Sequence, residues 1–85
     1  MDEPRIRALG EKLVRGPKRF QEVARHLAEG HDAAHIAVEM EVLPNTARQY
    51  IRHLVLWFGL SSLEAGEHSR IFAKIIEAAR IYANQ

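Results

Sequence analysis

The sequence predicts an all-α fold: a four- to five-helix domain with a central helix-turn-helix and a long C-terminal helix. Apolar residues recur at steps of three and four along several segments, which is the period of an amphipathic helix. Glycine and proline separate these segments at residues 16–17, 30, 44 and 59. A three-residue turn at 41–43 joins two of the segments closely enough for a helix-turn-helix.

The chain of 85 residues is long enough for one small domain, and we expect 1–85 to form a single helix-turn-helix domain. It contains no cysteine, which excludes disulfides and thiolate metal sites and is typical of a cytoplasmic protein. No apolar run approaches the length of a membrane span, and no hydrophobic stretch follows the basic N-terminal residues as it would in a secretory signal. We therefore expect a cytoplasmic protein with no membrane partner.

Residues 1–16 are expected to form an N-terminal extension with a helix at 4–15. Ile6, Leu9 and Leu13 share one face of that helix, and Gly16-Pro17 ends it. The sequence leaves three roles open for this helix: packing on the core, covering a partner site, or forming a loosely held arm.

A second helix is expected at 17–29. One set of residues forms its buried stripe: Phe20, Val23, Ala24 and Leu27. Gly30 follows as a C-cap. The basic residues Lys18, Arg19 and Arg25 lie off the stripe, where they could contact a DNA backbone.

The segment 32–58 organises the rest of the chain. Asp32 is a good N-cap for a short helix at 33–40, and Pro44 suits the first position of a second helix at 44–58. The apolar residues expected in the angle between these two helices are Ile36, Met40, Val42, Ala47 and Tyr50. This packing is that of a helix-turn-helix, whose second helix can enter a DNA major groove.

Polar residues point away from that angle. The candidates for contact with DNA are Asn45, Thr46, Arg48, Gln49, Arg52 and His53. Arginine can bind guanine or phosphate, whereas asparagine and glutamine can pair with adenine. From 44 to 58 the chain has two arginines and no acidic residue, although the net charge of the whole chain is only +1. A solvated polar face is the alternative interpretation.

The final helix is expected to run to about residue 83, with a capping box formed by Ser61 and Glu64 at its start. Its apolar arc is wide, which favours burial on two sides. One side could face the core, and the other a second chain in a homodimer or the N-terminal helix of the same chain. The residues predicted to contact a partner, together with two near the end of the preceding helix, are Leu56, Trp57, Ile71, Phe72, Ile75, Ile76, Ala79 and Tyr82.

The run AEGHDAAHIAVEMEVLPNTARQYIRHLVLWFGLSSLEA resembles the LuxR/GerE type of helix-turn-helix domain. The residues that carry the resemblance are Ala28, Glu29, Gly30, Ile36, Ala37, Glu39, Pro44, Asn45, Thr46, Arg48, Gly59, Ser62, Glu64 and Ala65. The resemblance implies a four-helix core, placed here at 17–65 and continued by an extended helix at 66–85. It also implies that the third core helix reads DNA and that the fourth helps to form a dimer.

This chain departs from the family pattern at three places. Glu41 stands where the family usually has glycine, and a left-handed conformation there would cost ~1–2 kcal/mol. Leu43 stands where a serine or threonine usually caps the recognition helix, and losing that cap costs ~1 kcal/mol. Leu56 and Trp57 replace the basic residues expected near the end of the helix. Trp57 could pack in the core or lie on a partner surface.

The remaining residues show no catalytic arrangement, so we expect that the protein is not an enzyme. The serines have no evident histidine and carboxylate partners, and the glycines form no phosphate-binding cluster. His31 and His35 could share a helix face near His26, but this ligand set is incomplete, so we predict no metal site and no cofactor.

The sequence therefore predicts a small DNA-binding transcriptional regulator that inserts helix 44–58 into the major groove, with double-stranded DNA as its partner and a homodimer as its expected state. The alternative is a protein-interaction module that keeps the helix-turn-helix fold but binds another transcriptional regulator instead of DNA. Low net charge, Glu41, Leu56, Trp57 and the wide apolar arc of the final helix favour this alternative.

Overall fold

The computed structural model describes residues 2–62 and 64–84, and within this part of the chain the fold is all-helical. Five helices follow one another: α1 (Glu3–Arg15), α2 (Lys18–Ala28), α3 (Ala33–Met40), α4 (Pro44–Trp57) and α5 (Ala65–Ala83). The all-α fold class is confirmed. Among the described residues, no helix combines the length and the apolar character needed to cross a membrane.

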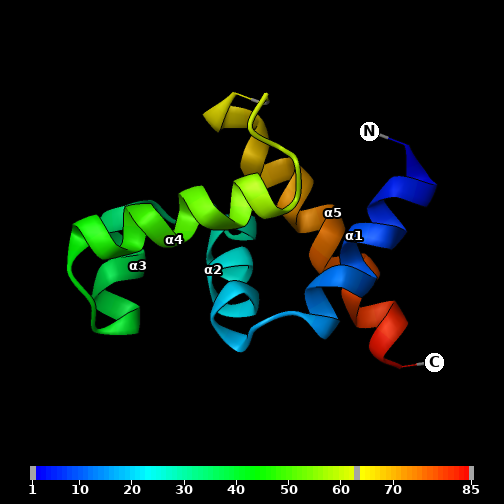
Figure 1. Cartoon of the computed structure of the whole chain (residues 1–85), viewed down its shortest axis with the longest axis horizontal. Coiled ribbons are helices and arrows are strands. Elements are labelled where there is room, and N and C mark those ends of the chain that lie inside the picture. The colour runs from blue at the N-terminus through cyan, green and yellow to red at the C-terminus, as the bar shows by residue number, and fades with distance from the viewer. Residues whose placement is uncertain (1, 63, 85) are drawn as a thin grey trace.

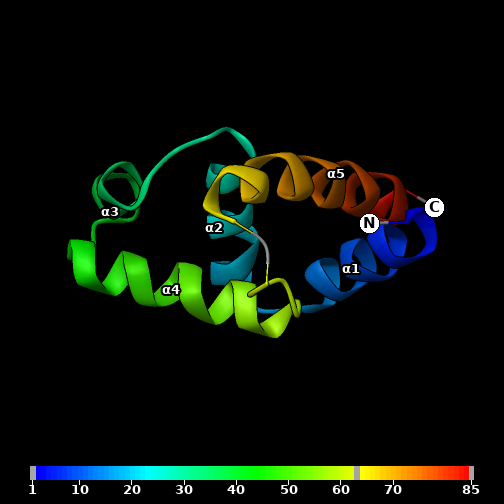
Figure 2. The ribbon, with the colours of Figure 1, turned by 90° about the horizontal axis from the view of Figure 1, so that it is seen from above.

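The helices form an elongated body of about 35 × 26 × 19 Å with two ends. At one end α1 and α5 pack along each other, and at the other α3 packs on the first part of α4 (Figures 1 and 2). Helix α2 packs against both α5 and α4 and so connects the two ends. The recognition helix predicted from the sequence thus runs from the α3 end toward the α1–α5 pair.

A main hydrophobic core joins α1, α2, α4 and α5. Its largest fully buried side chains are Leu13, Val23, Leu54, Leu60, Phe72 and Ile75. Leu13 belongs to the N-terminal extension, so α1 is part of the core rather than a loosely held arm. A second, smaller cluster of Ile36, Ala37 and Ala47 lies between α3 and α4.

Helix α1 approaches α5 closely at Gly10. A Cβ atom at this position would lie 2.8 Å from the Cβ of Ala78 and 2.8 Å from the backbone nitrogen of Ala79, so the two backbones can meet only where the side chain is missing. At the C-terminal end of α1, the Arg15 guanidinium donates to the Tyr82 hydroxyl over 3.0 Å. This hydrogen bond, with help from the Glu11 carboxylate, raises the pKa of Arg15.

The apolar arc of α5 is covered by α1 and α2, which corrects the prediction that most of it contacts a partner. Four of the residues predicted for that contact are buried within the chain itself: Ile71, Phe72, Ile75 and Ala79. Ile76 is half-buried and packs against the same core, and half-buried Tyr82 accepts from Arg15. Of the two explanations for the wide arc, burial against the extra N-terminal helix is the one observed.

The start of α5 also differs from the prediction. The helix begins at Ala65 with Glu64 as its N-cap residue, and the Glu64 side chain makes no capping hydrogen bond. Ser61 and Ser62 lie in a turn before the helix. Leu60 is only 1% exposed, and its burial turns the chain inward before a helix can begin at Ser61.

Candidate nucleic-acid interface

The turn between α3 and α4 is built by a left-handed residue. Glu41 has φ 57° and ψ 45°, and it is the one non-glycine residue with positive φ in the described part of the chain. Its N–H donates to the Val38 carbonyl and the Val42 N–H donates to the Ala37 carbonyl, which is the Schellman pattern of a helix C-terminus. The turn geometry is therefore formed, and the strain predicted for a residue other than glycine is present in the backbone.

The angle between α3 and α4 is filled much as predicted. Ile36 and Ala47 are fully buried there, and Met40 and Val42 pack around them. Tyr50 differs from the prediction, because it packs against the main core. Tyr50 comes about one turn after Ala47 in α4, and at that point its side chain already faces α2.

The polar face of α4 points outward. Asn45, Arg48, Gln49, Arg52 and His53 are exposed, and Thr46 is half-buried. The Arg48 guanidinium donates to the Asn45 side-chain oxygen over 2.6 Å, which holds these two side chains side by side in the first turns of the helix. This face therefore presents hydrogen-bond donors and acceptors and two positive charges.

The N-terminus of α4 adds to the positive character of this face. Leu43 is the N-cap residue, and its side chain satisfies none of the free N–H groups of the first turn, as its apolar chemistry requires. Leu43 is itself 73% exposed. Unpaired N–H groups and the positive end of the helix dipole favour an anion such as a phosphate.

Of the basic residues predicted for the DNA backbone, Arg19 lies next to α4. Its guanidinium carbon is 4.7 Å from the centre of the Tyr50 ring, in a cation–π contact. Lys18 and Arg25 are exposed on the same helix, α2. The structure thus brings Arg19 beside α4.

Trp57 is half-buried and packs against the main core, which is one of the two positions that the sequence leaves open for it and not the partner surface. Its ring lies 5.1 Å from the ring of Phe20, and a Cβ atom at Gly16 would overlap it. Lys12 lies over the same ring and donates from Nζ to the Trp57 carbonyl over 2.6 Å. The Lys12 ammonium group thereby pairs with a free carbonyl at the negative C-terminal end of α4. The sequence around Lys12 and Trp57 does not indicate this contact.

Leu56 is 55% exposed and borders an open groove on the outer side of α4. The groove has a volume of about 430 Å³ and is lined by Arg48, Ile51, Arg52, Val55, Leu56, Ser61 and His68. Two of the arginine side chains proposed to contact DNA therefore share a surface with exposed apolar atoms.

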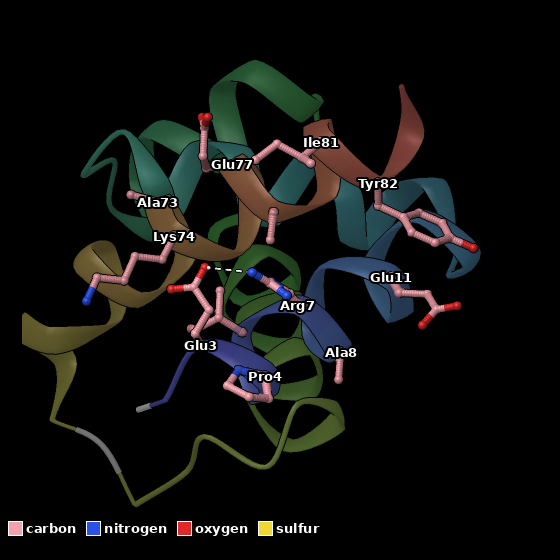
Figure 3. Close-up of a pocket in the computed structure, with 12 residues that line it drawn as sticks. Glu3, Pro4, Arg7, Ala8, Glu11, Ala73, Lys74, Glu77, Ile81 and Tyr82 are labelled. Atoms are coloured by element: carbon pink, nitrogen blue, oxygen red, sulfur yellow. Dashed lines mark ion pairs between the residues drawn. The ribbon is translucent and has the colours of Figure 1, made fainter. Parts of the chain in front are cut away.

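A larger open groove, of about 1060 Å³, lies between α1 and α5 at the other end of the molecule. Figure 3 shows charged side chains of both signs from α1 and α5 along this groove, with Ala8 and Ala73 also among its lining residues. Glu3 and Arg7 form an exposed ion pair here, with 3.6 Å between the carboxylate and the guanidinium. None of the predicted DNA contacts lines this groove.

The structure also gathers three histidines at which the sequence predicts no metal site. His26, His31 and His35 each offer a nitrogen atom within 4.8 Å of the others. Their sequence signal is weak because His26 and His31 are five residues apart. His26 lies in α2 and His31 follows the end of that helix, so the two do not share one helix face.

No protein-family model, no curated protein and no solved structure matches this chain.

Proposed function

We propose that this protein is a small DNA-binding transcriptional regulator that inserts α4 into the major groove. The observation that carries the proposal is the exposed face of α4, where Asn45, Arg48, Gln49 and Arg52 stand on a helix without acidic residues. Helix α3 and the main core hold this helix from behind. The resemblance of residues 28–65 to the LuxR/GerE type supports the same use of the helix.

DNA binding would use two kinds of contact, one to base edges and one to the phosphate backbone. The arginines and amides of α4 can reach base edges, where a bidentate pair with the correct base contributes about 1–3 kcal/mol of discrimination. Arg19, Lys18 and Arg25 of α2, together with the N-terminus of α4, would position the phosphate backbone. His53 is exposed beyond Arg52 and would reach the backbone as well.

A homodimer remains part of the proposal, but the buried residues of α5 do not support it. Among the exposed large apolar side chains, Leu56 on α4 and Ile81 on α5 could form such a contact. Sedimentation of the chain with and without duplex DNA would detect a dimer, and substitution of Ile81 or Leu56 by serine would identify its surface.

The test is fluorescence anisotropy with random-sequence duplex DNA at ~50 and ~200 mM salt. Each phosphate contact contributes about −0.9 to the slope of log K against log salt, so four contacts would weaken binding roughly 100-fold over this range. The double variant Arg48→Gln/Arg52→Gln should bind far more weakly at the lower salt. Arg70→Gln/Arg80→Gln, which removes the same charge from exposed positions on α5, is the matched control.

Absence of binding by the wild-type chain at ~50 mM salt would overturn the proposal. Equal losses in the two double variants would also overturn it, because the effect would then come from net charge alone and not from the face of α4.

The second candidate is a protein-interaction module, and exposed Leu56 beside the α4 groove favours it. Such binding would bury apolar surface and would therefore change little with salt. For this candidate, Leu56→Ser should abolish capture of a regulator, whereas Arg48→Gln/Arg52→Gln should retain it. Trp57 is unsuitable for the test because its ring packs in the core.

A further inference from the structure

The C-terminus of α2 folds His31 back onto His26. Gly30 has φ +83°, its N–H donates to the Leu27 carbonyl over 3.0 Å, and the His31 N–H donates to the His26 carbonyl over 3.0 Å. These bonds form a Schellman motif, which ordinarily brings two apolar side chains together at the same two positions. In this chain the two positions hold imidazoles, and their Nδ1 atoms lie 3.0 Å apart.

The start of α3 brings a third imidazole to the same place. Asp32 is the N-cap of α3, and its carboxylate accepts from the His35 N–H over 2.9 Å. This capping bond fixes the first turn of α3, and the His35 ring stacks on the His31 ring with 3.9 Å between the centroids. Two capped helix ends, one from α2 and one from α3, therefore converge on one group of three histidines.

We propose that His26, His31 and His35 bind a divalent transition-metal ion of the Zn²⁺ class. The bond from Zn²⁺ to a histidine nitrogen is about 2.0–2.1 Å, so two ligands of a tetrahedral ion lie about 3.4 Å apart. The 3.0 Å separation of the first pair is close to this value, and one nitrogen of each histidine lies within 4.8 Å of the others. His35 is exposed, so its ring would have to turn about its own side-chain bonds to bring its nitrogen closer to the other two.

The donor set decides the chemical class of the ion. Three imidazoles without a thiolate suit Zn²⁺, Ni²⁺ or Cu²⁺, whereas Mg²⁺ and Ca²⁺ require oxygen ligands. The sequence contains no cysteine that would compete for the ion elsewhere.

Two carboxylates accompany the histidines. The Glu29 carboxylate lies 3.6 Å from Nδ1 of His31, the same atom that approaches His26. Glu29 is therefore placed to supply a fourth ligand, or to hold a water molecule in that position. The Glu39 carboxylate lies 3.6 Å from Nε2 of His35 and would orient that ring, as carboxylates next to metal-binding histidines commonly do.

The ion would join two parts of the molecule that share few other contacts. Helix α2 contributes Val23 and Ala24 to the main core, whereas α3 packs on α4 through the small second cluster. A metal bound by residues of both α2 and α3 would hold α3 against the main body. Because this ion would bind the folded chain in preference to the unfolded one, it should raise the melting temperature.

The experiment is isothermal titration of ZnCl₂ into the full-length chain, prepared without a polyhistidine tag and treated with a chelator beforehand. We expect one ion per chain and a melting temperature that rises with the concentration of Zn²⁺. His31→Ala and His35→Ala should each lower the affinity by at least about tenfold, since losing a residue behind the ligands already costs roughly 10- to 100-fold. His53→Ala, at an exposed histidine on α4, is the matched control and should bind Zn²⁺ with the same affinity as the wild type.

Circular dichroism in the absence of metal shows whether each variant folds. Because His35 is exposed, His35→Ala should disturb the packing of the folded chain least. Equal Zn²⁺ affinity for the wild type and the triple variant His26→Ala/His31→Ala/His35→Ala would overturn the proposal. So would perturbation of fewer than three imidazoles in long-range ¹⁵N NMR spectra on addition of Zn²⁺, because the close approach of His26 and His31 would then be a simple N–H···N hydrogen bond.

Discussion

At the scale of single residues, the structure shows how the tight turn between α3 and α4 forms without a glycine. Glu41 occupies the left-handed position that ends α3, and its backbone makes the same two hydrogen bonds that a glycine would make. Its side chain is exposed, so neither a buried contact nor a buried ion pair compensates for the conformation. The strain is stored locally and can be removed by one substitution.

Glu41→Gly should stabilise the protein. A left-handed conformation costs a residue with a Cβ atom ~1–2 kcal/mol, and part of the gain is offset by the greater backbone entropy that glycine loses on folding. We expect an increase of about 0.5–1 kcal/mol in the free energy of unfolding, measured by urea denaturation. Glu39→Gly is the control: this residue lies inside α3, so glycine there should destabilise by about 0.5–1 kcal/mol. A loss of stability in Glu41→Gly would contradict the left-handed assignment.

At the scale of elements, α1 and α5 form a pair whose close approach depends on the missing side chain at Gly10. The distances of 2.8 Å from an ideal Cβ atom to Ala78 and to the backbone of Ala79 leave no room for a methyl group. The neighbouring atoms belong to backbone and to a short side chain, so they cannot move aside individually. Any residue larger than glycine must push the two helices apart.

Gly10→Ala should therefore destabilise the protein, although alanine is the better helix former. Overpacking of this kind costs about 1–3 kcal/mol, which outweighs the gain of about 0.5–1 kcal/mol in helix propensity. Gly66→Ala is the matched control, because a Cβ atom there would have no neighbour within 4 Å and the residue also lies in a helix. Thermal unfolding should shift down for Gly10→Ala and up for Gly66→Ala. Shifts of the same sign would argue against the close approach.

At the scale of the whole molecule, the apolar periodicity was sufficient to predict the five helices and most of the core stripes, including Ile6, Leu9 and Leu13 of α1. It could not show what each stripe packs against. The wide arc of α5 is compatible with a partner chain or with α1, and only the three-dimensional path of α1 decides between them.

At the candidate sites, too, helical periodicity predicts which side chains are exposed but not which distant residues they contact. That the polar residues of α4 face outward could be predicted from helical periodicity alone. The inward position of Trp57 depends on Phe20, Gly16 and Lys12, which come from other parts of the chain. The sequence places His31 and His35 near His26, but the 3.0 Å approach of His26 to His31 depends on the backbone reversal at Gly30, which helical spacing does not predict.

The burial of Leu13 provides a test of whether α1 is an integral part of the molecule. Leu13 is 2% exposed and lies in the main core with residues of α2, α4 and α5. Leu13→Ala should lower the free energy of unfolding by about 2–5 kcal/mol, because it removes buried apolar surface and leaves a cavity. Leu43→Ala is the control, since Leu43 is 73% exposed and its change should stay within about 0.5 kcal/mol. Urea denaturation should show a single transition in each case, with a lower midpoint for Leu13→Ala. A midpoint equal to that of the wild type would mean that α1 separates from the core before the remaining helices unfold, and the α1–α5 pair would then not belong to the cooperative unit.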